Sequence, residues 1–345
     1  MNQELLFKVA RILRIHNLFR PFYSGMGSIL MFHRIARKEN SQRIEKNRRN
    51  EVSPEFLELL LTFFLESGYE IVSLDTIYDY LVHRESQTRF VAFTFDDGYA
   101  DAYSLAYPMF RKYNAPFTIY VSTNYPDKKA VLWWYLLEDL LLRNDEIRFI
   151  HDKKDYLFPS EGHQKEKVFH SIRTLMMQRS NDDLESFIKD LFEPYGMDIY
   201  QYSYALTLDW SQIRIMSENP LVTIGAHTMD HYALRRLARE HAEQEILTSR
   251  KIIENRIGKK VEHFSYPFGG RGEAGEREFE MVRNMGFKTA TTTRIGNIFP
   301  THRDHLECLP RIPVSGNRES LSHIEAFTSG YISAMSNNFK KVITA

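Results

Sequence analysis

Short apolar runs alternate along the chain with longer segments in which apolar residues recur at helical spacing. The short runs are rich in β-branched and aromatic residues, which favour strands. We expect strands at residues 28–33, 70–73, 89–95, 117–121, 221–226, 262–266, 288–292 and 307–312. We expect helices at residues 54–67, 75–83, 99–113, 238–257 and 276–285. This alternation is typical of an α/β protein with a parallel sheet.

Several of the expected helices have recognisable ends. Ser53 is an N-cap followed by Pro54 at the first helical position. Asp209 is a second N-cap, and Gly258 and Gly286 follow the last residues of two other helices. Local signals therefore support the boundaries that the apolar period indicates.

Two stretches interrupt the alternation. Residues 36–52 are charged and show no apolar period, which predicts a loop. Residues 130–205 contain helical patterns and predict a mostly helical insertion. The remaining strand–helix units number seven or eight, so we predict an α/β fold, an irregular (β/α)7–8 TIM-like barrel. A doubly wound open sheet is the alternative, and it would gather ligands at a single switch point.

The predicted organisation has three parts. An N-terminal amphipathic helical segment covers residues 1–27. The barrel covers residues 28–330 and contains the insertion at about 130–205. Residues 331–345 form a C-terminal tail.

Polar residues with possible catalytic roles follow directly after two of the expected strands. Asp96 and Asp97 follow an apolar run and precede Gly98. Two adjacent carboxylates are costly unless a cation or a shared proton offsets their repulsion. A solvated Asp-Gly turn is the ordinary alternative.

A histidine pair follows the strand expected at 221–226. His227 and His231 lie four residues apart, so a helical turn would place both imidazoles on one face. Imidazole suits zinc and its first-row neighbours. Two His with one Asp make three ligands and leave a position open, as in catalytic rather than structural zinc sites. Such a pair also occurs on ordinary surfaces.

A third segment, Tyr-Pro-Phe-Gly at 266–269, follows the strand expected at 262–266. A Pro/Gly turn of this kind leaves backbone N–H groups that could point at a developing oxyanion.

These three motifs, in this order, resemble those of the polysaccharide deacetylases of carbohydrate esterase family four. The first strand, with the aromatic-His pair Phe32-His33, is similar to the opening strand of that family. The resemblance covers about residues 28–320 apart from the insertion. It implies a metal-dependent hydrolase that removes N-acetyl groups from an amino sugar in a polysaccharide or a glycan precursor.

The resemblance also implies roles for individual residues. Asp96 is the implied general base, and Asp97, His227 and His231 are the implied ligands of a divalent metal, with Zn2+ the first expectation. A backbone N–H at Tyr266 is implied to help hold the oxyanion.

The chain departs from the family pattern in three places. The pattern has an Arg shortly before Tyr-Pro, where this chain has His263 and Ser265. A late Leu-x-x-His strand that supplies the general acid has no clear counterpart, and neither has the late Asp that tunes it. The candidates for the acid are the late histidines His302, His305 and His323, but each of them fits an ordinary surface position better.

Three further residues are candidates for substrate contact. Arg311 stands where a last barrel strand would end, and His33 follows the first strand. Trp133, at the start of the insertion, could stack on a sugar ring. Core packing of Trp133 and His33, and an ordinary strand-end role for Arg311, are the alternatives.

Composition narrows the class of protein. The chain of 345 residues has 45 Lys plus Arg and 45 Asp plus Glu, so it has no overall excess of positive charge that would indicate nucleic-acid binding. Its single Cys308 excludes an intrachain disulfide, which permits a reducing compartment. No run is long enough to span a bilayer.

The first residues do not form a signal peptide, because Leu5-Leu6-Phe7 is followed at once by Lys8. Residues 4–16 predict an amphipathic helix that packs on the domain or, alternatively, contacts an anionic membrane surface. We therefore expect a cytoplasmic enzyme, or one at the inner face of the membrane, in the synthesis of cell-envelope polysaccharide.

Two other functions remain open from the sequence. Because no general acid stands out, the chain could be a carbohydrate-binding barrel without turnover. A metal amidase acting on a C–N bond outside a sugar is the other alternative.

Overall fold

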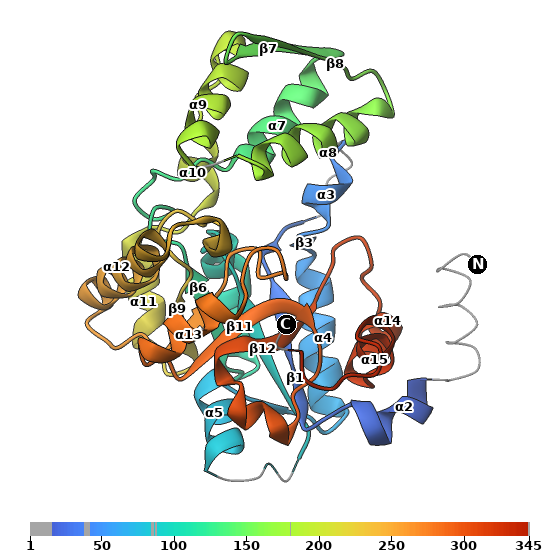
Figure 1. The fold of residues 1–345 in the computed structure, drawn as a ribbon. Coiled ribbons are helices and arrows are strands. Elements are labelled where there is room, and N and C mark those ends of the chain that lie inside the picture. The colour runs from blue at the N-terminus through green and yellow to red at the C-terminus, as the bar shows by residue number, and fades with distance from the viewer. Residues whose placement is uncertain (1–15, 38–41, 84–85, 87, 180, 344–345) are drawn as a thin grey trace.

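A ring of parallel strands forms the centre of the structure (Figure 1). The computed structural model describes residues 16–343 except 38–41, 84–85, 87 and 180. The ring consists of β1 (Gly27–Phe32), β5 (Phe90–Phe95), β6 (Phe117–Val121), β9 (Val222–Ala226), β10 (His263–Ser265), β11 (Thr289–Ile295) and β12 (Leu309–Pro313). Because β1 pairs with both β12 and β5, the ring closes, which excludes the open sheet. The short β4 (Glu70–Ile71) also pairs with β5.

All strands of the ring run in the same direction, so their carboxyl ends meet at one end of the barrel. In the ladder between β1 and β5, Phe32 lies opposite Phe95. The residues that follow these two, His33 and Asp96, therefore enter the same end of the barrel side by side.

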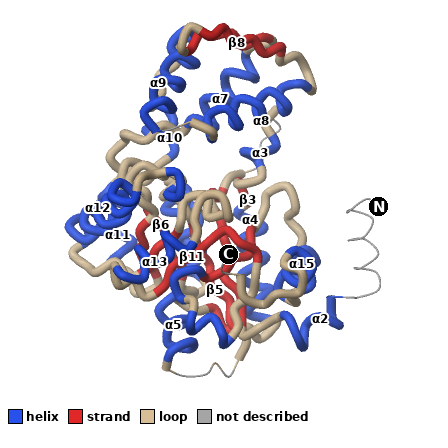
Figure 2. Tube along the Cα trace, viewed as in Figure 1, coloured by secondary structure: helices blue, strands red, loops and turns tan. Residues whose placement is uncertain are grey.

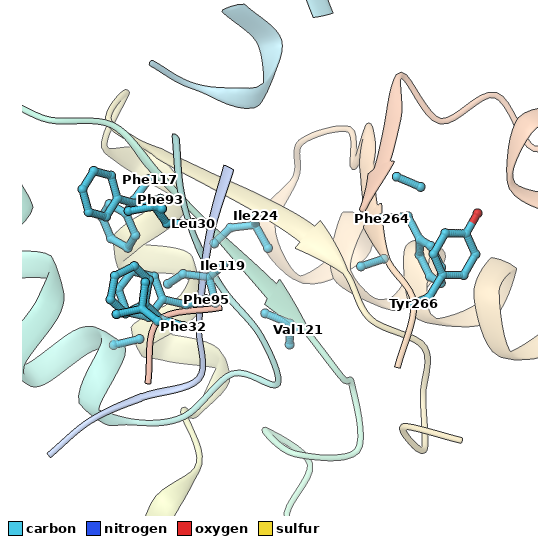
Figure 3. Close-up of a cluster of buried hydrophobic side chains, with 14 of the residues drawn as sticks. Leu30, Phe32, Phe93, Phe95, Phe117, Ile119, Val121, Ile224, Phe264 and Tyr266 are labelled. Atoms are coloured by element: carbon cyan, nitrogen blue, oxygen red, sulfur yellow. The ribbon is translucent and has the colours of Figure 1, made fainter. Parts of the chain in front are cut away.

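Helices cover the outside of the ring, as the blue segments around the red strands in Figure 2 show. They are α4 (Pro54–Glu66), α5 (Leu74–Val82), α6 (Tyr107–Lys112), α11 (Trp210–Glu218), α12 (Arg239–Ile257), α13 (Glu276–Asn284) and α14 (Leu321–Thr328). Outward strand residues pack beneath them, and Figure 3 shows Leu30, Phe32, Phe93 and Phe95 gathered in this core. The inward residue Thr94 instead hydrogen-bonds inside the ring.

The predicted helix signals agree with the structure. The Ser53 hydroxyl accepts the Phe56 N–H at 3.2 Å at the start of α4. Asp209 caps α11 in a reciprocal pair with Gln212. The expected helix at 99–113 begins instead as a π-helical turn, Ala102–Ala106, before α6.

The segment 36–52, predicted as a loop, contains short regular elements. They are α3 (Glu45–Arg48) and β3 (Glu51–Val52), which pairs with β2 (Arg34–Ile35). Partly buried ion pairs hold this segment: Arg43 lies 2.7 Å from Glu51 and 2.9 Å from Glu138 of the insertion. The pairing, rather than an apolar period, orders these charged residues.

The insertion is mostly helical, as predicted, and forms the upper lobe in Figure 1. Its elements are α7 (Trp133–Arg143), β7 (Glu146–His151), β8 (Lys154–Pro159), α8 (Gln164–Met177), α9 (Asn181–Phe192) and α10 (Gln201–Leu206). The hairpin of β7 and β8 was not predicted. The lobe has its own apolar core, which includes Leu140, Phe149, Ile172 and Phe187.

The first and last described helices pack against each other. Helix α2 (His16–Tyr23) contacts α15 (Tyr331–Ser336), and the rings of Phe19 and Tyr331 lie 5.1 Å apart. The expected tail from residue 331 therefore includes a helix. The amphipathic prediction for residues 4–16 lies almost entirely outside the described residues. No helix in the described part of the chain is long and apolar enough to cross a membrane, and the cytoplasmic location stays a prediction.

Candidate active site

A cavity of about 310 Å³ opens at the carboxyl ends of the strands, within the size range of small-molecule sites. The lining residues that concern the chemistry are His33, Asp96, Asp97, Trp133, Trp134, His227, His231 and Phe268. They come from β1, β5, β9, β10 and the insertion, which are far apart in the sequence. The parallel barrel is what brings them together.

Asp97, His227 and His231 form one cluster in this cavity. The Nε2 atoms of His227 and His231 lie 3.3 Å and 3.1 Å from Oδ1 of Asp97. Burial raises the pKa of Asp97, but the two histidines lower it more, so the pKa lies well below its usual value. The Asp97 side chain is therefore a carboxylate at neutral pH.

The donor set of this cluster fits a divalent cation. The Nδ1–H of His227 donates to the Ser265 carbonyl at 2.7 Å, which is the arrangement in which Nε2 of a metal-ligating His serves as the acceptor. That acceptor faces Oδ1 of Asp97, a buried atom without a hydrogen bond in the described structure. Either a proton or a metal cation must lie between atoms that face one another in this way. Two His and one Asp with an open position suit catalytic zinc.

The loop after β9 holds the two histidines without a helix. The sequence predicted a helical turn that would align them, but residues 227–231 form an irregular loop in which Thr228 and His231 have φ of 66° and 58°. The buried carboxylate of Glu245 on α12 accepts the N–H groups of Met229 and Asp230 at 2.9 Å and 3.0 Å. Hydrogen bonds therefore fix the loop where helical geometry does not.

Asp96 makes a different set of contacts from Asp97. Both of its oxygens accept from Arg311, at 2.7 Å each, in a bidentate pair. Burial raises the pKa of Asp96, but Arg311 and His227 bring it below its usual value. Asp96 is therefore ionised and oriented, and it stays outside the Asp97–histidine cluster.

Arg311 is fully buried, and each of its five N–H groups has an acceptor. Nε donates to the Thr292 carbonyl at 2.9 Å, and the terminal nitrogens donate to Thr94, Ser265 and both oxygens of Asp96. The predicted role of Arg311 in substrate contact is wrong on this geometry, because no donor is left for a substrate. Ser265, which stands near the position of the family's Arg, instead receives a hydrogen bond from this Arg.

Sequence comparison decides the family. Residues 83–290 match the sequence model of the family described as polysaccharide deacetylase, which is more than half of the chain. The chain belongs to the polysaccharide deacetylase family. A search of curated proteins returned no match.

Solved deacetylase structures share the fold at low sequence identity. The deacetylase PplD of Streptococcus pyogenes, solved with acetate, is 17% identical with a TM-score of 0.57, over 87% of this chain and 97% of that chain. IcaB of Ammonifex degensii is 16% identical with a TM-score of 0.56, over 88% and 97%. A de-N-acetylase of Aggregatibacter actinomycetemcomitans is 16% identical with a TM-score of 0.55, over 87% and 99%.

Tyr266 does not reach the cavity of this deacetylase. Its N–H donates to the Thr291 carbonyl at 3.2 Å, and its buried hydroxyl donates to the Glu307 carbonyl at 2.8 Å. Figure 3 shows its ring beside Phe264 in the apolar core. The expected oxyanion contact at Tyr266 is therefore wrong, because the β10–β11 ladder extends to this residue.

The late histidines lie away from the cavity. His302 is buried, and its Nδ1 accepts the Phe299 N–H at 2.9 Å; burial lowers the pKa of His302 to about 4. His305 ends the same 3-10 segment, and His323 lies on α14 against Phe327. None of the three lines the cavity, so the structure excludes them as the general acid.

Two other predicted contacts do line the cavity. His33 is half-buried beside Asp96, and Trp133 packs edge-to-face on Trp134 with ring centroids 5.3 Å apart. Their contact with a substrate remains a prediction.

Sequence reasoning missed the roles of Glu245 and Ser265. Glu245 lies on the buried stripe of α12 with Ala242, Ile246 and Ser249. A carboxylate on an otherwise uncharged buried stripe is the signal that could have found it, because a buried charge requires partners. Burial raises the pKa of Glu245 to about 7.

Proposed function

We propose that this chain is a metal-dependent N-deacetylase that acts on an acetamido sugar in a polysaccharide or glycan precursor. One observation supports this most strongly. An ionised Asp96, held by Arg311, stands in the same cavity as a separate Asp97–His227–His231 cluster whose acceptor atoms face one another. Acetate, which the PplD structure contains, is the product that this proposal predicts.

The residues divide the chemistry of amide hydrolysis between them. A divalent cation held by Asp97, His227 and His231, with zinc the first candidate, would supply Lewis-acid activation of water and of the acetyl carbonyl. Asp96 accepts the proton of the attacking water, and Arg311 keeps its carboxylate oriented.

The backbone N–H of Phe268 takes the place expected for Tyr266. Phe268 lines the cavity, its ring lies 4.7 Å from that of His231, and its φ of 60° turns the backbone sharply. Among the described residues no hydrogen bond engages this N–H. It is therefore the backbone donor best suited to the tetrahedral oxyanion.

His33 supplies the proton that the leaving amine needs. Three histidines line the cavity, and two of them face Asp97. His33 remains, beside Asp96 at the end of the neighbouring strand. A general acid in this place argues against the non-catalytic alternative, which depended on the absence of one.

The role of His33 predicts an alkaline loss of activity. Burial, the largest influence, lowers the pKa of His33 below its usual value of 6.5, and Asp97 and Asp96 offset part of this. Because only protonated His33 can donate, kcat/KM should fall as pH rises through that lowered pKa. His33→Gln should lower kcat by about 10²-fold and remove this limb of the pH profile.

The matched control for His33 is His323→Gln, which lies outside the cavity and should leave the profile unchanged. A His33→Gln enzyme with the wild-type profile would exclude His33 as the acid.

Metal removal tests the proposal directly. Chelation should abolish acetate release from N-acetylhexosamine oligomers, and added Zn2+ should restore it. Because a ligand that binds only the folded state stabilises it, Zn2+ at about 100 times its Kd should add about 2.7 kcal/mol to the free energy of unfolding. Thermal melting of the chelated protein with and without Zn2+ measures this.

Asp97→Ala is the control for metal removal, since it should lose both the thermal shift and the activity. Acetate release that persists in the chelated enzyme would overturn metal dependence. Release from small cyclic amides but from no acetylated sugar would instead identify a non-sugar amidase.

A further inference from the structure

Three cationic side chains line the same cavity: Lys46, Arg49 and Arg173, together called the cationic wall below. Lys46 lies on α3, Arg49 in the turn that follows, and Arg173 on α8 of the insertion. None of the three has an ion pair with a carboxylate among the described residues. They belong to none of the steps assigned above, so their position in the cavity needs another explanation.

The acids of the cavity do not neutralise this wall. Asp96 is paired with Arg311, and Asp97 faces the two histidines. Glu273 is the remaining carboxylate in the lining, and its charge raises the pKa of Arg173. Three cations therefore face one free acid, which leaves an excess of positive charge.

The cations repel one another in the absence of a ligand. Burial, together with Arg173 and Arg49, lowers the pKa of Lys46. Burial and Arg236 likewise lower the pKa of Arg173, against the opposing effect of Glu273. An anion bound between them would relieve this repulsion.

The wall is held in place by the scaffold. The Ile44 N–H donates to Glu138 at 2.6 Å, and the Asn47 side chain donates to the Trp134 carbonyl at 2.9 Å, so α3 is fixed to α7. On α8, Ile172 and Met176 are buried in the core of the lobe on either side of Arg173. Charges presented from fixed elements can bind an anion at low entropic cost.

We infer that the substrate carries an anionic group, a phosphate or a carboxylate, beside its acetamido sugar. Arg binds both groups through paired hydrogen bonds, and Lys adds a point charge. This inference rests on the proposed function and specifies its substrate class: an acidic glycan rather than a neutral N-acetylhexosamine polymer.

Three substrates test the inference, in acetate release at low ionic strength. They are a neutral N-acetylglucosamine oligomer, an oligomer of N-acetylhexosamine and uronic acid, and an N-acetylhexosamine phosphate ester. We expect one of the acidic substrates to exceed the neutral one in kcat/KM by at least about tenfold, and added salt to reduce the difference. The preferred acidic substrate identifies the anion.

Variants separate the wall from the catalytic machinery. Arg49→Gln and Arg173→Gln should each lower kcat/KM for the acidic substrate about tenfold, and by more than they lower it for the neutral substrate. Arg48→Gln is the matched control, because Arg48 is next to Arg49 in the chain and equally exposed but does not line the cavity. An equal loss on acidic and neutral substrates would overturn the inference.

Binding distinguishes failure of this inference from failure of the proposed function. Calorimetry with the Asp96→Asn variant should show the sugar phosphate or the uronate oligomer bound at least about tenfold more tightly than its neutral counterpart. Equal affinities overturn the acidic-substrate inference even if acetate is released. Selective binding with no acetate release from any substrate retains the anion site and overturns the deacetylase proposal.

Discussion

Replacing Asp96 with Asn is expected to lower kcat by about 10³-fold while the metal content stays unchanged. Asn cannot accept a proton from the attacking water, but it retains an oxygen for Arg311. The metal is assigned to Asp97 and the two histidines, none of which is altered. Acetate release and metal analysis of the same sample measure both parts of the prediction.

The control for Asp96→Asn is Asp75→Asn. Asp75 lies at the amino ends of the strands, where Lys288 at 2.7 Å and His263 at 3.4 Å pair with it. The pKa of Asp75 is lowered by His263 and, against the effect of burial, by Lys288. At pH values above the usual Asp pKa, Asp75→Asn should lower the free energy of unfolding. It should leave turnover unchanged. Loss of metal from Asp96→Asn with unchanged kinetics would contradict the assigned roles.

The sequence was sufficient to predict the barrel and the site residues that follow its strands. Strand β6 was predicted with its observed bounds, and Asp96, Asp97, His227 and His231 converge in one cavity as expected. The physical reason is simple. Apolar runs locate the strands, and parallel strands bring their carboxyl ends together whatever their separation in the chain.

Partners across the barrel could not be predicted in the same way. Asp96 and Arg311 are 215 residues apart, and their contact depends on the register of β12. The ladder between β11 and β12 shifts between Thr291 and Ile295, an irregularity for which the sequence gives no local signal. The N–H of Tyr266 was misassigned for a related reason, since its partner Thr291 lies on the adjacent strand.

The missed hairpin of the insertion did have a signal. Burial alternates along β7, where Ile147, Phe149 and His151 are buried. The turn residues Asp152 and Lys153 both have positive φ, of 49° and 63°. Their sequence is Asp-Lys rather than the Asn-Gly or Asp-Gly that usually indicates such a turn, so the period of two was not recognised.

Replacing Arg311 with Lys is expected to lower kcat/KM by about 100-fold and to move the acid limb of the pH profile upward. Lys cannot reproduce the paired hydrogen bonds to Asp96 at 2.7 Å. Burial raises the pKa of Asp96, and Arg311 is the largest influence that lowers it. With that influence weakened the pKa rises, so Asp96 becomes protonated, and inactive as a base, at a higher pH than in the wild type.

Two comparisons show whether Arg311 acts through Asp96. Adding Asp96→Asn to Arg311→Lys should cause little loss beyond that of Asp96→Asn alone, because both changes remove the same oriented base. Arg294→Lys is the matched control: Arg294 is buried on the neighbouring strand and donates to the Ala274 carbonyl at 2.8 Å. It should lower the melting temperature without moving the acid limb. If the activity losses of the two single variants multiply in the double variant, Arg311 supports only the fold. The same conclusion follows if Arg311→Lys does not move the acid limb of the pH profile.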